Sequence, residues 1–295
     1  MTDAGAPGWG ARDMTSPLRE VLVHRPDAAF GDAFANPAHA FRHRVDLPTA
    51  QYEHDAYTDL LGTLGVRVHR LVVVQGDDPD LVYTFDPALM TEAGAVLLRP
   101  GKPNRESEPR IIRNWLRRAD VPIVGRIGPR ASVEGGDVCR LRPNLVCIGR
   151  SLRTNQAGAS QLMKVLGGLE PRLEVRSFDL PYWRGPDELV HLLSVISPIA
   201  PDLAVVFPPL LPVGVWDLLA ELGIRTIAVP DDEWETLGCN VLAIEPGVVV
   251  MADGNPLTRR ALESAGCEVH VYPATEIGLN GSGGPTCMAL PVRRD

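Results

Sequence analysis

A cysteine near the end of the printed sequence has the surroundings of a reactive residue. The segment Asn280-Gly-Ser-Gly-Gly-Pro-Thr-Cys287 brings three glycines and a proline to one cysteine, and a short apolar run follows it. Because glycine tolerates positive φ and close backbone approach, this pattern predicts a tight loop that leads into a short buried strand. A thiolate is a strong nucleophile when its surroundings lower the thiol pKa from about 8.5. A free cysteine is more often a small buried apolar residue, so the neighbours of Cys287 must decide between these interpretations.

Four other loops carry isolated polar groups that could act with this cysteine. They span residues 80–86, 132–137, 188–194 and 238–241, and they hold Asp80 and Asp86, Glu134, His191 and Asn240. Each loop follows the second strand of a predicted strand–helix–strand unit. If the units are arranged around an axis, these equivalent loops meet at one end. Carboxylates, a histidine and a cysteine would then share one cleft, although a lone histidine is more often a structural residue.

The elements that must position these loops recur five times. Each unit has a short apolar strand, an amphipathic helix and a second strand, followed by a polar loop into a third strand. The predicted strand, helix and strand ranges are 21–24, 52–64 and 66–71; 95–98, 108–119 and 121–124; 144–148, 156–166 and 173–178; 203–207, 213–222 and 224–229; and 247–251, 256–265 and 268–272. Gly65, Gly223 and Gly266 are expected to cap helices. An ordinary doubly wound sheet is the alternative, but the recurring reactive loops favour five α/β modules.

The combined residue types suit one kind of substrate. A cysteine and a histidine supply a nucleophile and a general acid or base. Carboxylates in the same cleft oppose thiolate formation unless the substrate is itself a cation. A planar guanidinium fits, because it binds a carboxylate through two hydrogen bonds and its charge favours the thiolate. Attack at the guanidinium carbon, loss of an amine and hydrolysis of a covalent thiouronium would give a ureido product without a metal or organic cofactor.

Several ordered motifs resemble those of the guanidino-group-modifying enzymes. They are Arg99-Pro-Gly-Lys-Pro-Asn-Arg105, Glu134-Gly-Gly-Asp137, Ile148-Gly-Arg-Ser-Leu-Arg153-Thr-Asn155, His191, and Gly-Gly-Pro-Thr-Cys287-Met. Between Val21 and Arg293 the sequence is similar to dimethylarginine dimethylaminohydrolases and to arginine deiminases, which share the pentein fold. The resemblance implies a pseudo-fivefold, five-bladed α/β propeller built from ββαβ-type units.

The resemblance also implies a role for each matching residue. It makes Cys287 the nucleophile, His191 the general acid and base, and Glu134 the group that polarises the histidine. Asp80 and Asp86 match carboxylates that hold the guanidinium. Arg105 and Arg153 match arginines that bind the α-carboxylate of the substrate. Leu18 matches a lid residue of the dimethylaminohydrolases.

Two positions help to decide which branch of the family the sequence resembles more. Phe85 stands immediately before Asp86, where dimethylaminohydrolases carry a glutamate and arginine deiminases an arginine, so it is expected to alter the substrate pocket. Leu193 stands where arginine deiminases carry an acidic residue, which favours the dimethylaminohydrolase branch. Dimethylarginine hydrolysis to citrulline and dimethylamine is the expected reaction. The alternatives are hydrolysis of arginine or another guanidine, amidino transfer to an amine, and a non-catalytic propeller that binds a cationic ligand or a partner protein.

Composition limits the other functions. Of 295 residues, 45% are hydrophobic and 22% charged, as in globular proteins, and the net charge of -8 argues against nucleic-acid and anionic-membrane binding. Prolines interrupt the most apolar stretch, 203–220, so no membrane span is expected. Five scattered cysteines fit a reducing, cytoplasmic setting, and Cys139, Cys147, Cys239 and Cys267 are expected in the core. Residues 1–16 are expected to form a disordered leader before one catalytic domain, 17–295, and a homodimer is a further expectation.

Overall fold

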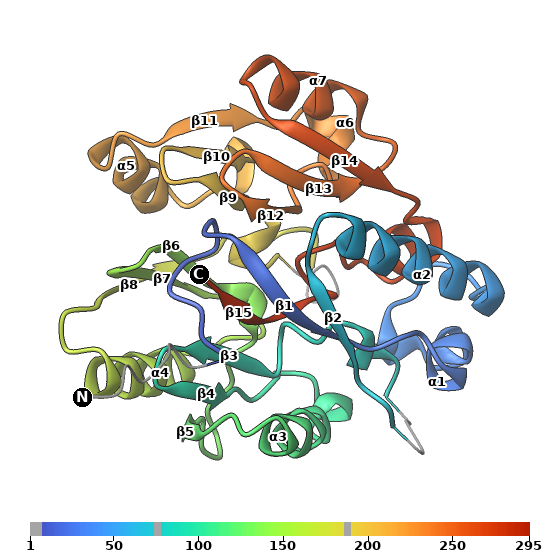
Figure 1. The fold of residues 1–295 in the computed structure, drawn as a ribbon, viewed down its shortest axis with the longest axis horizontal. Helices are drawn as coiled ribbons and strands as arrows, with labels where there is room; N and C mark the ends of the chain where they lie inside the picture. Colours follow the sequence, from blue (N-terminus) through green and yellow to red (C-terminus); the bar gives the residue numbers. More distant parts are fainter. Residues whose placement is uncertain (1–7, 74–77, 186–189) are drawn as a thin grey trace.

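Fifteen strands form five separate sheets of three strands each in the computed structural model, which describes residues 8–73, 78–185 and 190–295 (Figure 1). The sheets are β15 (Leu290–Arg294), β1 (Leu18–Val23) and β2 (Arg67–Arg70); β3 (Ala88–Thr91), β4 (Gly94–Leu97) and β5 (Ile123–Arg126); β6 (Val138–Arg142), β7 (Leu145–Arg150) and β8 (Glu174–Asp179); β9 (Ile196–Ala200), β10 (Leu203–Val206) and β11 (Arg225–Ala228); and β12 (Val241–Glu245), β13 (Val248–Ala252) and β14 (Glu268–Tyr272). One continuous doubly wound sheet is therefore the wrong alternative.

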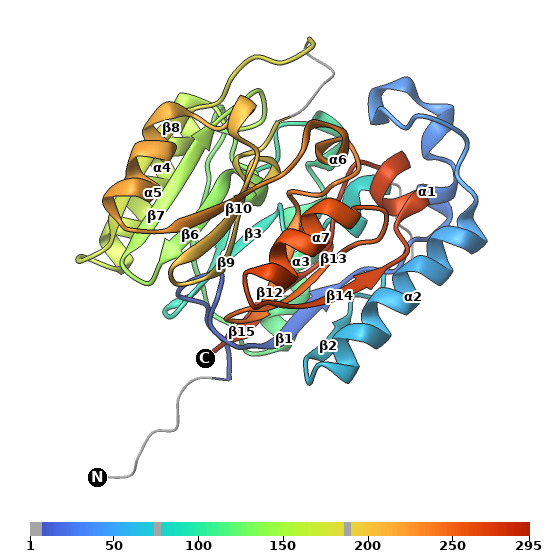
Figure 2. The same cartoon turned by 90° about the horizontal axis from the view of Figure 1, so that it is seen from above.

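All five sheets share one internal plan. The central strand has one antiparallel and one parallel neighbour. In four sheets the antiparallel neighbour is the strand before it in the sequence, as in β3–β4–β5, and in the first sheet it is β15. A parallel neighbour needs a crossover connection, and a helix provides it in every case. The crossover helices are α2 (Leu47–Thr63), α3 (Glu108–Arg118), α4 (Gln156–Leu169), α5 (Val213–Glu221) and α7 (Pro256–Ser264). These helices lie on the outside of the sheets in both views (Figures 1 and 2).

The sequence pattern located the crossover helices well. Helix α2 begins at Leu47 rather than Tyr52, because Pro48 fits the first helical turn and extends it backward. Gly65, Gly223 and Gly266 have φ angles of 80°, 66° and 91°, so the predicted glycine caps are confirmed. The apolar period marks these elements because each helix buries one face.

The first sheet joins two distant parts of the sequence. Strand β15 pairs antiparallel with β1, and β1 pairs parallel with β2, so the same ββαβ plan is completed across the chain. Leu18 lies opposite Arg294 in this sheet and is 2% exposed. A side chain fixed in a strand core does not act as a lid, so the expectation for Leu18 is wrong.

The expected disordered leader needs a correction over residues 8–16, while residues 1–7 lie outside the described part. The Gly10 N–H donates to Val292 O at 2.8 Å, and Arg294 N–H donates to Gly10 O at 2.7 Å. Arg140 Nη1 also donates to Ala11 O at 2.9 Å. This segment therefore extends the edge of the first sheet. Its glycines and alanines suggested disorder, but they are small enough to lie along a strand edge.

The connection from β1 to α2 contains an arrangement that the sequence did not reveal. It holds the short helix α1 (Ala28–Gly31) and the 3-10 turns Ala33–Ala35 and Pro37–His39. The Asn280 side chain accepts hydrogen bonds from the backbone of Arg42 and His43, at 2.9 and 3.0 Å. This connection thus packs on the loop that leads to Cys287.

The apolar residues form clusters between the sheets and their helices. Cys139, Cys147, Cys239 and Cys267 are buried in them, as expected. Within the described residues, no helix combines the length and the apolar character that crossing a membrane requires.

Candidate active site

Five connections, one from each α/β unit, meet at a single place. They join β2 to β3, β5 to β6, β8 to β9, β11 to β12, and β14 to β15, and each neighbouring pair shares a hydrogen bond. The bonds run from Gly136 N to Asp86 Oδ1 (2.9 Å), between His191 Nε2 and Glu134 Oε2 (2.7 Å), from Trp234 Nε1 to Ser194 O (2.9 Å), from Asn240 Nδ2 to Cys287 Sγ (3.3 Å), and from Phe85 N to Cys287 O (3.1 Å). The structure therefore brings together the loops that repetition predicted to converge.

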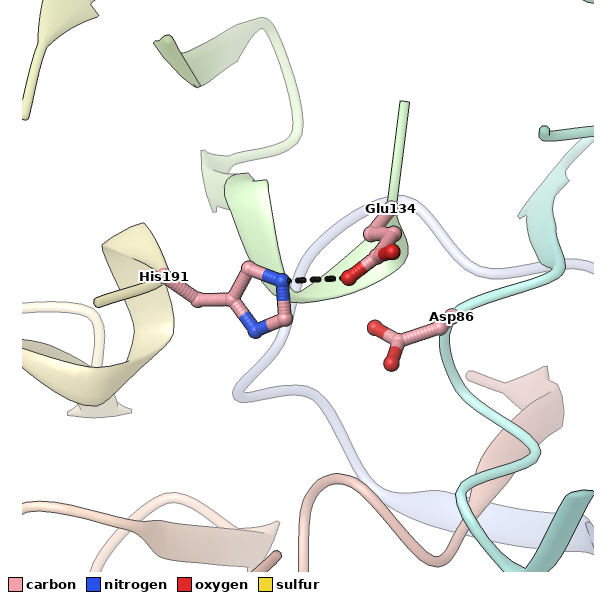
Figure 3. A group of neighbouring side chains, drawn as sticks. All are labelled: Asp86, Glu134 and His191. Carbon is pink, nitrogen blue, oxygen red and sulfur yellow. Dashed lines mark hydrogen bonds and ion pairs between the residues drawn. The ribbon is translucent and has the colours of Figure 1, made fainter. Parts of the chain in front are cut away.

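Glu134 lies at the centre of this arrangement, and its side chain is fully buried. One oxygen bonds His191, and the other accepts the Gly101 N–H at 2.8 Å (Figure 3). Burial alone would raise the pKa of Glu134, but the bond to His191 and the charges of Arg105 and Arg153 hold that pKa well below its ordinary value. Glu134 is thus a fixed anion beside the histidine.

The two glycines after Glu134 are required by close packing. A Cβ atom on Gly135 would lie 2.2 Å from the carbonyl oxygen of Phe85, and one on Gly136 would lie 2.5 Å from His191 Nδ1. Any side chain at Gly136 would therefore displace the imidazole. The Gly-Gly pair does more than close a turn.

His191 is held as an imidazolium. Burial lowers its pKa, but Asp137, the hydrogen bond to Glu134 and the charge of Asp86 outweigh burial and raise the pKa to about 9. The imidazole is therefore protonated at neutral pH, which suits a general acid.

Asp137 positions this histidine through the backbone. Its Oδ1 accepts the N–H of Leu192 at 3.0 Å, and its Oδ2 accepts the hydroxyl of Ser151 at 2.5 Å. Burial raises the pKa of Asp137 to about 6. No role was expected for Asp137 from the sequence, although its place three residues after Glu134 was a usable signal.

Cys287 is half-buried, whereas the other four cysteines are buried. Burial and the nearby charge of Asp86 raise the pKa of its thiol to about 11, against the opposing effects of Gly284, Asn240 and Arg105. Asn240 also accepts the Thr286 N–H through Oδ1 at 3.1 Å, which fixes the amide that faces the sulfur. Without a ligand Cys287 is a thiol, and an added positive charge would favour the thiolate.

Arg105 lies deep in the site with its guanidinium engaged. Nε and Nη2 donate to the two oxygens of Glu108 at 2.6 and 2.8 Å, and Nη1 donates to Asp86 Oδ2 at 2.8 Å. Burial would lower the pKa of Arg105, but these carboxylates raise it well above its ordinary value. A substrate carboxylate would have to compete with Glu108 for this arginine.

Asp80 is also buried and paired. Its Oδ2 accepts Lys102 Nζ at 3.0 Å and Asn104 Nδ2 at 3.3 Å. Although burial opposes the charge, Arg105 and Lys102 lower the pKa of Asp80. Neighbouring Asp78 is buried as well, and burial together with Asp80 raises its pKa to about 6.

Arg153 and Phe85 occupy different environments. Arg153 Nη1 lies 3.6 Å from Glu134 Oε1, and its side chain remains 16% exposed. The ring of Phe85 packs into the apolar cluster that contains Leu192. Its backbone N–H donates to the carbonyl oxygen of Cys287. Any effect of Phe85 on the pocket would therefore act through the packing of this loop.

The side chains that could bind a metal ion already lie beside a positively charged residue of the same chain. Donor atoms of Asp86, Glu134 and His191 lie within 4.8 Å of one another (Figure 3). Arg105 Nη1, however, lies 2.8 Å from Asp86 and 3.9 Å from Glu134, and His191 is itself cationic. Two positive groups among these donors do not fit a resident metal ion.

Comparison with known proteins agrees with this geometry. A sequence model of the family described as "Arginine deiminase" matches residues 69–216 and 212–294. The arginine deiminase of Rhodococcus erythropolis is 31% identical over 195 residues, which cover 56% of this chain and 47% of that protein. The arginine deiminase of Listeria monocytogenes is 27% identical over 255 residues, 74% of this chain and 62% of that protein. The chain thus spans about half the length of these curated relatives.

Two of the solved structures match this chain over a larger share of its length and of their own. A dimethylarginine dimethylaminohydrolase adduct with S-methyl-L-thiocitrulline superposes with a TM-score of 0.77 and 25% identity, covering 92% of this chain and 99% of that one. The N-terminal domain of ArgZ, a cyanobacterial arginine dihydrolase, superposes with a TM-score of 0.79 and 20% identity, covering 93% of this chain and 98% of that one. This match shows a shared fold. The predicted resemblance to the pentein superfamily is confirmed. The chain belongs to the arginine deiminase family.

Proposed function

We propose that this protein is a cysteine-dependent hydrolase of guanidino C–N bonds, with Cys287 as nucleophile. The carrying observation is that burial and the nearby charge of Asp86 raise the pKa of the half-buried Cys287 thiol to about 11, in a site that also holds the protonated His191. Such a thiol stays protonated until a cation enters. A guanidinium supplies that cation and the carbon to be attacked, so activation of the nucleophile and binding of the substrate coincide.

The residues then have definite tasks. With a guanidinium bound beside Asp86, the thiol loses its proton to solvent and the thiolate adds to the central carbon. The tetrahedral adduct expels an amine that takes its proton from the His191 imidazolium, leaving an S-linked thiouronium cation and a neutral imidazole. His191 then removes a proton from water, and the resulting hydroxide adds to the thiouronium carbon. Collapse of this neutral adduct breaks the C–S bond, and the hydroxyl proton passes to the departing sulfur, which restores the Cys287 thiol. The ureido product leaves, and Glu134 stabilises His191 in its protonated form again.

The proposed substrate is dimethylarginine, converted to citrulline and dimethylamine. Support comes from the near-complete match to the dimethylaminohydrolase structure, set against the partial match to the curated arginine deiminases. Leu193 in place of the acidic residue expected for arginine deiminases points the same way. We also propose that the five sheets are the blades of one pseudo-fivefold propeller, supported by the cycle of hydrogen bonds around the site.

A product assay tests the proposal. Purified protein is supplied with arginine, monomethylarginine, asymmetric dimethylarginine and agmatine, and the ureido product and released amine are quantified separately. We expect citrulline and dimethylamine in equal amounts, and no turnover by Cys287→Ser at an unchanged melting temperature.

Two outcomes would contradict the proposal. Full activity of Cys287→Ser would exclude the covalent mechanism. Turnover of arginine in preference to its methylated forms would retain the mechanism and reject the substrate. Repeating the assay with glycine or lysine present measures any transfer to an acceptor amine.

A further inference from the structure

A buried tyrosine of the first unit contacts the loop that carries Cys287. Tyr57 lies on α2, is fully buried, and donates its hydroxyl to the carbonyl oxygen of Pro285 at 2.8 Å. Its ring lies on that of Tyr272, with 4.9 Å between the ring centroids. Burial raises the pKa of Tyr57 well above its ordinary value, so the hydroxyl remains a hydrogen-bond donor. The proposed reaction gives this tyrosine no task.

Helix α2 also holds the beginning of the segment that leads to Cys287. Glu53 lies one turn before Tyr57 on the same face of the helix and is 1% exposed. Its carboxylate accepts three successive backbone N–H groups at 2.7, 2.9 and 3.2 Å, at the start of the π-helical turn Thr275–Asn280. The segment between residues 275 and 285 is therefore fixed to α2 at both ends.

The peptide group that follows Pro285 is hydrogen-bonded on both sides. Its carbonyl oxygen accepts from Tyr57, and its N–H, which belongs to Thr286, donates to Asn240 Oδ1 at 3.1 Å. The same side-chain amide of Asn240 donates through Nδ2 to Cys287 Sγ at 3.3 Å. Three hydrogen bonds thus connect the tyrosine hydroxyl to the sulfur.

All three hydrogen bonds point toward the sulfur. The chain runs from the Tyr57 hydroxyl through one backbone amide and one side-chain amide. An amide whose oxygen accepts a hydrogen bond becomes a stronger donor at its N–H, so each bond strengthens the next. Burial and the charge of Asp86 raise the pKa of the Cys287 thiol, and the bond from Asn240 opposes them. A donor at the start of the chain therefore supports the group that stabilises charge on the sulfur.

We propose that Tyr57 is a positioning residue that favours the Cys287 thiolate through this chain of hydrogen bonds. The inference rests on the proposed function, because that function makes Cys287 the nucleophile. The Tyr57 hydroxyl orients and polarises the peptide between Pro285 and Thr286, and Asn240 transmits the effect to the sulfur. Every proton of the chain stays on its donor, so the chain stabilises the thiolate without transferring a proton.

Alkylation of Cys287 tests the chain in the free protein. Tyr57→Phe keeps the ring and removes the donor, so the rate of reaction with iodoacetamide at pH 8, followed by peptide mass spectrometry, should fall about threefold. Tyr272→Phe is the matched control, because the Tyr272 hydroxyl is buried and has no hydrogen-bond partner within the described residues. It should leave the rate unchanged. An unchanged rate in Tyr57→Phe, or an equal fall in Tyr272→Phe, would overturn the proposal.

A double substitution distinguishes the chain from a general loosening of the loop. If Tyr57 acts through Asn240, adding Tyr57→Phe to Asn240→Ala should slow alkylation no further than Asn240→Ala alone. Independent losses that multiply in the double variant would contradict the proposal. The melting temperature of each variant shows whether it is folded. Because alkylation needs no substrate, absent turnover by the wild-type enzyme would reject the proposed function alone.

Discussion

The inner and outer parts of the site are built differently. The inner part consists of Asp86, Arg105, Glu108, Glu134 and His191, which are linked by several buried contacts. The outer part consists of Lys102, Arg153, Asp80 and Asn104, whose two cations stay partly exposed. A buried ion network is costly to break, whereas partly exposed pairs contribute little to stability. The inner part is therefore suited to fixing protonation states, and the outer part to exchanging its contacts with a ligand.

Replacing Arg105, the arginine of the inner part, should produce the largest change in stability. Arg105→Met leaves the buried carboxyl groups of Glu108 and Asp86 without their hydrogen-bonding partner, and we expect the free energy of unfolding to fall by about 3–5 kcal/mol. Arg153→Met should cost less than about 1 kcal/mol. Urea denaturation measures both, with the exposed Arg117→Met as control. Similar losses for Arg105 and Arg153 would remove the distinction between the two parts.

A small change beside the histidine should impair activity more than stability. The added Cβ of Gly136→Ala would lie 2.5 Å from His191 Nδ1 and displace the ring from Glu134, so we expect kcat to fall about 100-fold or more. Gly167→Ala in α4, where a Cβ meets open space, should keep full activity and match or exceed the wild-type melting temperature. An active Gly136→Ala enzyme would show that the ring position is not critical.

Cysteine reactivity tests the contact between Asn240 and the sulfur. Asn240→Asp replaces an N–H donor with an anion, so the pKa of Cys287 should rise further and alkylation at pH 8 should slow about 10-fold. Peptide mass spectrometry after iodoacetamide treatment measures the rate at Cys287. The four buried cysteines serve as an internal control, because they should react only on unfolding. Unchanged alkylation would mean that the amide does not tune the thiol.

The pH dependence of stability should be the most modest effect. The folded pKa of His191, about 9, exceeds its ordinary value of 6.5, so its stabilisation is complete below pH 6.5 and is lost as pH rises toward 9. Glu134 has a lowered folded pKa, so its contribution is lost as pH falls below about 4.5. Denaturation between pH 6 and 10 should show a decline that His191→Gln removes. The same decline in the variant would assign it to another group.

Regular periodicity explains which parts of the fold were predictable. The crossover helices and the strands flanking them carry apolar patterns that burial imposes, and they match the structure within a few residues. The connection that contains α1 has no such period, since it is held by side-chain bonds such as those of Asn280. The ordered segment near Gly10 was missed because strand-edge pairing uses backbone groups that any residue has.

The candidate site was likewise predictable only in part. Cys287, His191 and Glu134 could be singled out because they lie in the equivalent loops of the repeated units and in motifs that resemble those of the family. The engagement of Arg105 by Glu108 and the pairing of Lys102 with Asp80 depend on rotamers and burial, which the sequence does not specify. Their roles could therefore be weighed only after the distances were known.

The pairing of β15 with β1 has a consequence for biosynthesis. Cys287 lies just before β15, and its carbonyl accepts the Phe85 N–H, across about 200 residues of sequence. Contacts of such separation form late, because the intervening chain must first be synthesised and brought together. A growing polypeptide would complete four of its sheets before this one. The surroundings of Cys287 would thus be assembled only after β15 has been synthesised, and translation products that stop before β15 would lack them.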